Sequence, residues 1–168
     1  MRRVFPMIFI ALGAALFLGA AGWFYLDNLV KHPAALTLPE RIAGLSLTDQ
    51  MTGAEAAENF INLHNQRFPI TSGAIGFYGG NQTTIWAAGV PFNFMVAGMV
   101  NSMRDKISEG KSPFTPTNEY LFAGRTVYEL EGMGQRHFYF QSNNLIVWLA
   151  ADPSIADEAI EQILEAYP

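Results

Sequence analysis

The feature that most constrains this chain is an uncharged apolar run near its N-terminus. No charged residue occurs between Arg3 and Asp27. At about 1.5 Å of rise per residue, a helix from Val4 to Tyr25 would be roughly 33 Å long, which is enough to cross the hydrocarbon core of a bilayer. Trp23 and Tyr25 stand at the end of the run, where aromatic rings favour the headgroup region. The sequence therefore predicts a transmembrane anchor within residues 1–26.

The orientation of this helix follows from the charges that flank it. Arg2 and Arg3 precede the run, and positive residues favour the cytoplasmic side of a membrane. We expect a single-pass protein of the plasma membrane with a cytoplasmic N-terminus and an extracytoplasmic C-terminal domain. A cleavable signal peptide is the alternative, because Gly19-Ala20-Ala21 offers small residues after an apolar segment. A chain cleaved there would be secreted.

Small residues also form a stripe along the apolar run. Ala11, Ala15 and Gly19 fall at i, i+4 and i+8, a spacing that lets two transmembrane helices approach closely. The stripe is a candidate helix-packing face for a homo-oligomer or a partner helix. Alanine and glycine are also common in any transmembrane helix, so generic composition explains the same pattern.

Charge and composition exclude several classes of function. Arg2 and Arg3 precede the apolar run, so 8 of the 10 Lys and Arg residues lie beyond it, together with all 15 Asp and Glu. An acidic domain without a basic cluster lacks the electrostatic footprint of a nucleic-acid-binding protein. The chain has no cysteine, which excludes disulfides, thiolate catalysis, cysteine-based zinc sites and a lipidated cysteine.

Beyond the apolar run we expect a stalk at residues 27–37 and one domain at residues 38–168. Three helices are predicted: 53–65, opened by a capping box from Thr52 to Glu55; 91–108, with Pro91 in its first turn; and 152–167, capped by Asp152. Period-2 patterns and turn residues predict strands at 42–47, 74–78, 83–88, 120–122, 125–131, 135–141 and 145–150. The fold class is therefore α+β, with an antiparallel sheet packed with about three helices.

An internal similarity appears when the chain is shifted by 62 residues. Ile85-Trp86 then aligns with Val147-Trp148, and Pro91 aligns with Pro153. Each aligned unit is a hairpin that ends in a tryptophan-containing strand and turns through proline into a helix. We interpret this as a pseudo-repeat of a hairpin-plus-helix unit with pseudo-twofold symmetry.

Aromatic residues in the predicted hairpins supply the candidate ligand-binding residues. Alternation sends half of them to each face of the sheet, so they either pack in the core or line an exposed patch or pocket. The candidates for a binding pocket are His137, Tyr139, Trp86 and Trp148.

No catalytic, metal or cofactor motif is found. The three histidines, His32, His64 and His137, lack the short spacing of a metal pair. Met95, Met99 and Met103 share a helix face, which we interpret as packing and not as a Cu(I) site. Glu129 and Glu131 share a strand face, which is typical of the wet side of a half-buried sheet and not of an acid/base pair.

These observations favour a non-enzymatic, membrane-anchored extracytoplasmic domain that binds another protein as an accessory part of a membrane or envelope assembly. One alternative is an exported domain that binds a small apolar ligand between its sheet and helices. A second alternative is an unrecognised hydrolase that uses His64 or His137 with dispersed carboxylates.

Overall fold

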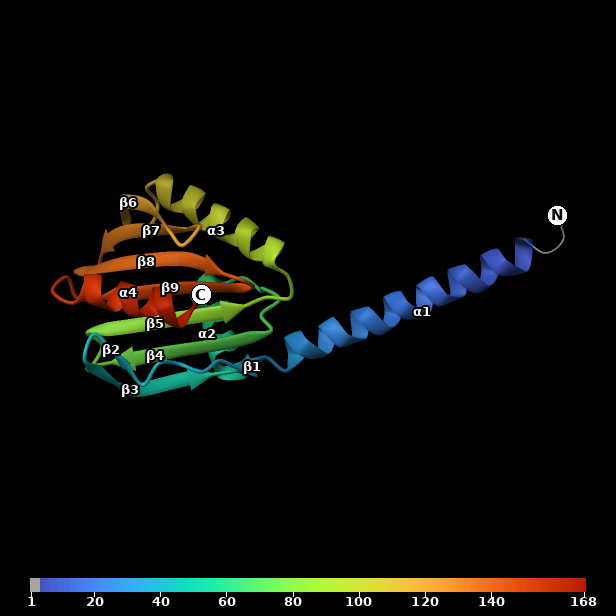
Figure 1. Ribbon diagram of the computed structural model, residues 1–168, viewed down its shortest axis with the longest axis horizontal. Coiled ribbons are helices and arrows are strands. Elements are labelled where there is room, and N and C mark those ends of the chain that lie inside the picture. Colours follow the sequence, from blue (N-terminus) through green and yellow to red (C-terminus); the bar gives the residue numbers. More distant parts are fainter. Residues whose placement is uncertain (1–3) are drawn as a thin grey trace.

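The N-terminal apolar run forms one long helix that projects away from a sheet-and-helix domain (Figure 1). The structure, a computed structural model, describes residues 4–168, and the side chains from Met7 onward. Arg2 and Arg3, on which the predicted orientation depends, lie outside the described residues. Helix α1 spans Val4–Lys31, and its segment Met7–Lys31 is long and apolar enough to cross a membrane. An anchor and a signal sequence both fit this finding.

Helix α1 continues past the predicted end at Tyr25 and takes up part of the expected stalk. Lys31 Nζ donates to Asp27 Oδ2 at 2.7 Å, an i, i+4 ion pair that also places a cation at the C-terminal end of the helix dipole. Strand β1, Ala34–Ala35, then pairs in parallel with the start of strand β4. Only His32 and Pro33 separate the helix from the sheet.

Within residues 4–168, nine strands form a single sheet, which is antiparallel apart from the short pairing of β1 with β4. The remaining strands are β2 (Arg41–Ile42), β3 (Leu45–Thr52), β4 (Ser72–Tyr78), β5 (Thr83–Gly89), β6 (Thr115–Phe122), β7 (Arg125–Gly132), β8 (Gln135–Ser142) and β9 (Leu145–Ala151). Their order across the sheet is β2-β3-β4-β5-β9-β8-β7-β6. The three helices of the domain are α2 (Ala54–His64), α3 (Asn93–Ser108) and α4 (Ala156–Ala166). The predicted α+β class, with three helices on an antiparallel sheet, is confirmed.

The helices cover both faces of the sheet. On strand β5, Ile85 packs in the cluster that contains α4, whereas its neighbour Trp86 packs in the cluster that contains α2. Trp148 on β9 lies directly opposite Trp86 and packs in the α3 cluster. Because successive residues of a strand point to opposite faces, α2 and α3 share one face and α4 covers the other.

Both predicted helix caps are wrong in detail. Helix α2 begins after Gly53, whose φ of 59° suits glycine, and Thr52 makes no capping hydrogen bond because it belongs to strand β3. Helix α4 begins at Ala156 and not at Asp152, with Ile155 at the N-cap position. The chain between them forms a turn, in which the Ile155 N–H donates to the Asp152 carbonyl.

Three further boundaries differ from the prediction. The single strand expected at 42–47 is a tight hairpin of β2 and β3, which turns through Ala43 and Gly44 at positive φ. Helix α3 begins at Asn93, two residues after Pro91, with Phe92 in an extended conformation before it. The strand expected at 120–122 is longer and already begins at Thr115, as strand β6.

The predicted pseudo-repeat holds for the hairpins but not for the helices. Strands β5 and β9 pair with Trp86 opposite Trp148, and the pairs Thr83 with Ala151 and Gly89 with Leu145 flank this centre symmetrically. A twofold axis through the tryptophans would place α3 and α4 on the same face. They lie on opposite faces, because the apolar residues that point away from α2 and α3 also require a cover.

One buried hydrogen bond fastens the segment before β2 to the sheet, and its loss is testable. Tyr78 is fully buried, and its hydroxyl donates to the Pro39 carbonyl at 2.7 Å. Tyr78→Phe should lower the free energy of unfolding by about 1 kcal/mol, because the Pro39 carbonyl loses its donor. Chemical denaturation of the detergent-solubilised chain measures this effect. Tyr120→Phe, at a half-buried tyrosine on β6, is the control and should cost less.

Candidate functional site

Three of the four candidate binding residues lie together under helix α3. These three are His137, Tyr139 and Trp148. The rings of Tyr139 and Trp148 stack in a row with Tyr128, which stands on the neighbouring strand β7. The ring centroids of Tyr128 and Tyr139 are 4.7 Å apart with planes at 12°, and those of Tyr139 and Trp148 are 5.2 Å apart at 11°. His137 lies beside this row on β8. The sheet register brings these residues together, because they alternate onto the face that α3 covers.

His137 is the strongest candidate for chemistry, and both of its ring nitrogens are occupied. Its Nδ1 accepts from Trp148 Nε1 at 3.2 Å, and its Nε2 lies 3.0 Å from the Gly132 carbonyl oxygen. An indole N–H can only donate, so Nδ1 carries no proton and Nε2–H donates to Gly132. The imidazole is therefore neutral. Burial lowers the pKa of His137, which is 3% exposed.

The surroundings of His137 are aromatic. The Phe114 ring packs 4.7 Å from the imidazole and 5.2 Å from the Trp148 indole, measured between centroids. A neutral imidazole closed in by Phe114 and hydrogen-bonded on both sides is suited to fixing the strands it joins. It leaves neither nitrogen available to a substrate or a metal ion in this conformation.

Trp86, the fourth candidate, is placed beside this group but belongs to a different cluster. It lies opposite Trp148 in the β5–β9 pairing, and it packs with Phe60 and Ile75 under helix α2. Tyr139 is buried, whereas the two tryptophans are half-buried. The four residues thus form a continuous aromatic layer between the sheet and its two helices.

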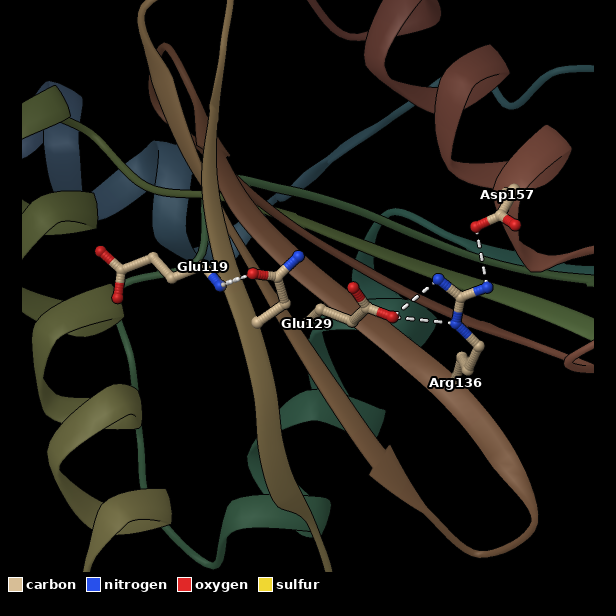
Figure 2. Close-up of polar contacts among 5 residues, drawn as sticks. Glu119, Glu129, Arg136 and Asp157 are labelled. Carbon is tan, nitrogen blue, oxygen red and sulfur yellow. Dashed lines mark hydrogen bonds and ion pairs between the residues drawn. The ribbon is translucent and has the colours of Figure 1, made fainter.

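The two glutamates considered as an acid/base pair do not act as one unit. Arg136 donates to Glu129 Oε1 through Nε at 2.9 Å and through Nη2 at 2.7 Å, and to Asp157 on α4 through Nη1 at 2.8 Å. Figure 2 shows Glu129 turned toward this guanidinium, while Glu119 points away from it. Glu131 is exposed. The Glu129 carboxylate therefore serves an ion pair that joins β7, β8 and α4.

Two open concavities lie at opposite ends of the sheet. One, of about 570 Å³, lies at the end where strands β6 and β8 finish; its lining residues are Asn93, Ala123, Gly124, Arg125, Gln141, Asn143 and Pro168. The other, of about 340 Å³, surrounds the β7–β8 turn; its lining residues are Glu131, Gly132, Gly134, Gln135, Arg136 and Pro153. Neither concavity is lined by His137, Tyr139, Trp86 or Trp148.

The guanidinium at the larger concavity is also engaged within the fold. Arg125 donates to the Tyr167 carbonyl, and its Nη2 donates to the Leu164 carbonyl at 2.9 Å. These are carbonyls of the last turn of α4, where a cation is favoured. Arg125 therefore fastens the end of α4 to the start of β7.

The remaining candidates take ordinary structural positions. Met95, Met99 and Met103 pack against the core cluster under α3, as expected for a packing stripe. Across the part of the chain that the structure describes, no group of three His, Cys, Asp or Glu side chains is placed to hold a metal ion. Ala11, Ala15 and Gly19 are exposed along α1, and their role in helix packing stays a prediction.

Sequence reasoning missed a set of exposed apolar side chains on the domain. Phe92 falls within the helix predicted at 91–108, but α3 begins one residue after it, and Phe92 is 44% exposed. Phe94 is 73% exposed and Leu121 is 75% exposed. The unusual pattern Phe-Asn-Phe at a helix start, and a strand ending in Leu-Phe, are the signals that could have indicated them.

Comparison with known proteins adds no relative. No protein-family model matches the chain, and no similar curated protein or solved structure is found.

The neutral state of His137 makes stability depend on pH. The unfolded chain protonates this residue below a pKa of about 6.5, whereas burial lowers the pKa of His137 in the folded protein. Acidification below about pH 6.5 therefore favours the unfolded state, by at most about 1.4 kcal/mol per pH unit, until the folded pKa is reached.

Comparison with His137→Gln isolates this contribution. Glutamine can accept from Trp148 and donate to Gly132 but does not titrate near neutral pH. Urea unfolding at pH 7.5 and pH 5.5 should show a wild-type advantage over the variant that shrinks at the lower pH. An advantage of equal size at both pH values would contradict a neutral His137.

Proposed function

We propose that this chain is a single-pass plasma-membrane protein whose extracytoplasmic domain binds another protein. In this binding, an extended segment of the partner pairs with edge strand β6. The domain would then act as an accessory component of a membrane or envelope assembly. Helix α1 supplies the anchor. The exposed strand β6 supplies the binding edge.

The observation that carries this proposal is the state of β6. The strand is the last in the sheet order, so one side of its backbone has no strand partner within the described chain. Seven of its eight residues are exposed, and Tyr120 is half-buried. A strand edge of this kind presents a row of N–H and C=O groups that an extended segment of a partner can pair with.

The second half of β6 is less protected than the first. Pro116 and a register shift between Pro116 and Asn118 disturb the edge where the strand begins. From Asn118 to Phe122 the pairing with β7 is regular, and Leu121 offers an apolar anchor that is 75% exposed. At the other end of the sheet, β2 has two residues and pairs only with Leu45 and Ser46, so the rest of β3 is also an edge. That edge is disturbed by a register shift between Leu47 and Asp49. The asymmetry favours β6 as the binding edge.

The geometry gives less support to the two alternative functions. A ligand pocket would need access to the aromatic layer, but Phe114 and the helices cover His137 and Tyr139. A hydrolase would need a free general base, and the hydrogen bonds from Trp148 and to Gly132 engage His137. The other candidate base, His64, has its Nδ1 2.9 Å from the Phe60 carbonyl oxygen of its own helix.

The anchor makes a direct prediction about the mature protein. If α1 is retained, intact-mass measurement of the protein from membranes of its own host should give a chain that includes residues 1–21. Alkaline carbonate washing should leave it in the membrane fraction, because a span of this length inserts stably. A mature N-terminus close to Ala21 would show that a signal peptidase removes the anchor.

The binding edge is tested by crosslinking at a matched pair of exposed positions. A photo-crosslinking amino acid at Leu121 should capture a discrete protein partner in the host membrane. Met133, which is 73% exposed in the β7–β8 turn, is the control position and should not. Leu121→Lys should weaken the affinity for the partner at least tenfold relative to Met133→Lys, because a lysine on an edge strand opposes strand addition. Equal crosslinking at both positions would contradict the proposed edge.

A further inference from the structure

The end of the domain from which α1 departs is identified by the sheet register. Ala34 in β1 pairs with Ser72 in β4, Ser72 pairs with Gly89 in β5, and Gly89 pairs with Leu145 in β9. Helix α3 begins beside this row, because Gln141 Nε2 donates to the Asn93 carbonyl at 3.2 Å. Figure 1 shows α3 beginning on the side of the domain from which α1 projects. We call this side the anchor end.

Two phenylalanines at the anchor end are exposed as a pair. The rings of Phe92 and Phe94 stack with their centroids 5.4 Å apart and their planes at 10°. Phe92 is 44% exposed and Phe94 is 73% exposed. Single exposed apolar residues are ordinary on a protein surface, whereas these two stacked rings form one contiguous apolar surface at one end of the domain.

The exposed stripe of α3 changes character along the helix. It begins at the anchor end with Phe94, continues through the small residues Ala97 and Gly98, and reaches polar Asn101 and acidic Asp105 farther away. A helix that is exposed to water along its whole length is expected to carry polar residues on its exposed side from the first turn to the last. The order suits a helix whose first turn touches an apolar phase and whose last turns stand in water.

The short connection holds the anchor end close to the bilayer. If the apolar run leaves the hydrocarbon core near Tyr25, the helical segment from Asp27 to Lys31 adds only about 8 Å between that core and the domain. His32 and Pro33 are the only residues between α1 and β1. The headgroup layer is itself roughly 5–8 Å thick on each side. The anchor end therefore faces the surface of the membrane that α1 enters.

Charge indicates the kind of contact. At the opposite end of the sheet, Glu131, Asp152 and Asp157 lie around the β7–β8 turn and the start of α4, where Arg136 pairs with Asp157. The chain is net acidic, with 15 Asp and Glu against 10 Lys and Arg, so anionic headgroups would not attract it. A contact at the anchor end must therefore depend on apolar insertion.

We propose that Phe92 and Phe94 insert into the headgroup–acyl boundary of the leaflet in which α1 ends, so that the domain rests on the membrane. The occupant of this surface is lipid with zwitterionic headgroups. This inference rests on the retained anchor of the proposed function, but it does not depend on strand β6 or on any protein partner.

The absence of cysteine makes the test direct, because single cysteines can be placed at will. The full chain is reconstituted in phosphatidylcholine nanodiscs with an environment-sensitive fluorophore at Phe94→Cys, Met133→Cys or Leu16→Cys. Phe94 and Met133 are both 73% exposed but lie at opposite ends of the sheet, so they form a matched pair. Leu16 lies within α1 and reports insertion of the anchor.

We expect a blue-shifted emission at positions 94 and 16. A spin label near the lipid headgroup should quench the fluorophore at position 94, and a spin label deep in the acyl chain should quench the fluorophore at position 16. Position 133 should stay aqueous in both lipids. Quenching at 16 without quenching at 94 would overturn the inference and leave the anchor intact, and quenching at neither would overturn both. A blue shift at 94 without lipid quenching would mean that a second copy covers Phe94, which also overturns the membrane contact.

Discussion

The pairing of strand β5 with strand β9 is the constraint on which the rest of the domain depends. It joins two four-stranded meanders, β2 to β5 and β6 to β9, into one sheet. Seven residue pairs make this junction, and Trp86 and Trp148 lie at its centre. The two strands are separated by helix α3 and three other strands, so this contact is among the most costly in loop-closure entropy. The apolar layers on both faces of the junction compensate for that cost.

Local patterns were sufficient to predict most of the elements and the fold class. The hairpins β4–β5 and β8–β9 combine strands rich in apolar and aromatic residues with turn residues such as Gly80 and Asn143, so their strand ends were predicted within two residues. The three helices followed from apolar periodicity. The errors lie at the termini, where tertiary pairing decides. Thr52 joins strand β3 and cannot cap α2, and Thr115 joins β6 although it lies between Pro113 and Pro116.

The sequence indicated which residues of the candidate site share a face of the sheet, but not their hydrogen bonds or their burial. Strand alternation correctly places His137 and Tyr139 on one face, but it cannot tell whether that face is open. The bond from Trp148 to His137 depends on the diagonal register of β8 and β9, and Phe114 reaches the imidazole from the loop before β6. Both are long-range facts of packing. The exposed Phe92 was missed for a related reason, because helix α3 begins two residues later than Pro91 suggested.

The length of the connection between α1 and the sheet links the anchor to the orientation of the domain. A flexible stalk of eleven residues, as expected for 27–37, would let the domain turn freely and would make the position of any surface residue irrelevant to the membrane. The helix instead runs to Lys31, and β1 enters the sheet at Ala34. If α1 is retained in a membrane, as we propose, the anchor end faces lipid. Strand β6 runs toward that end and finishes at Phe122, beside the turn at Ala123 and Gly124. An apolar contact at the anchor end would fix the tilt of the domain and so hold β6 in one direction relative to the membrane, where a partner in the same membrane could reach it.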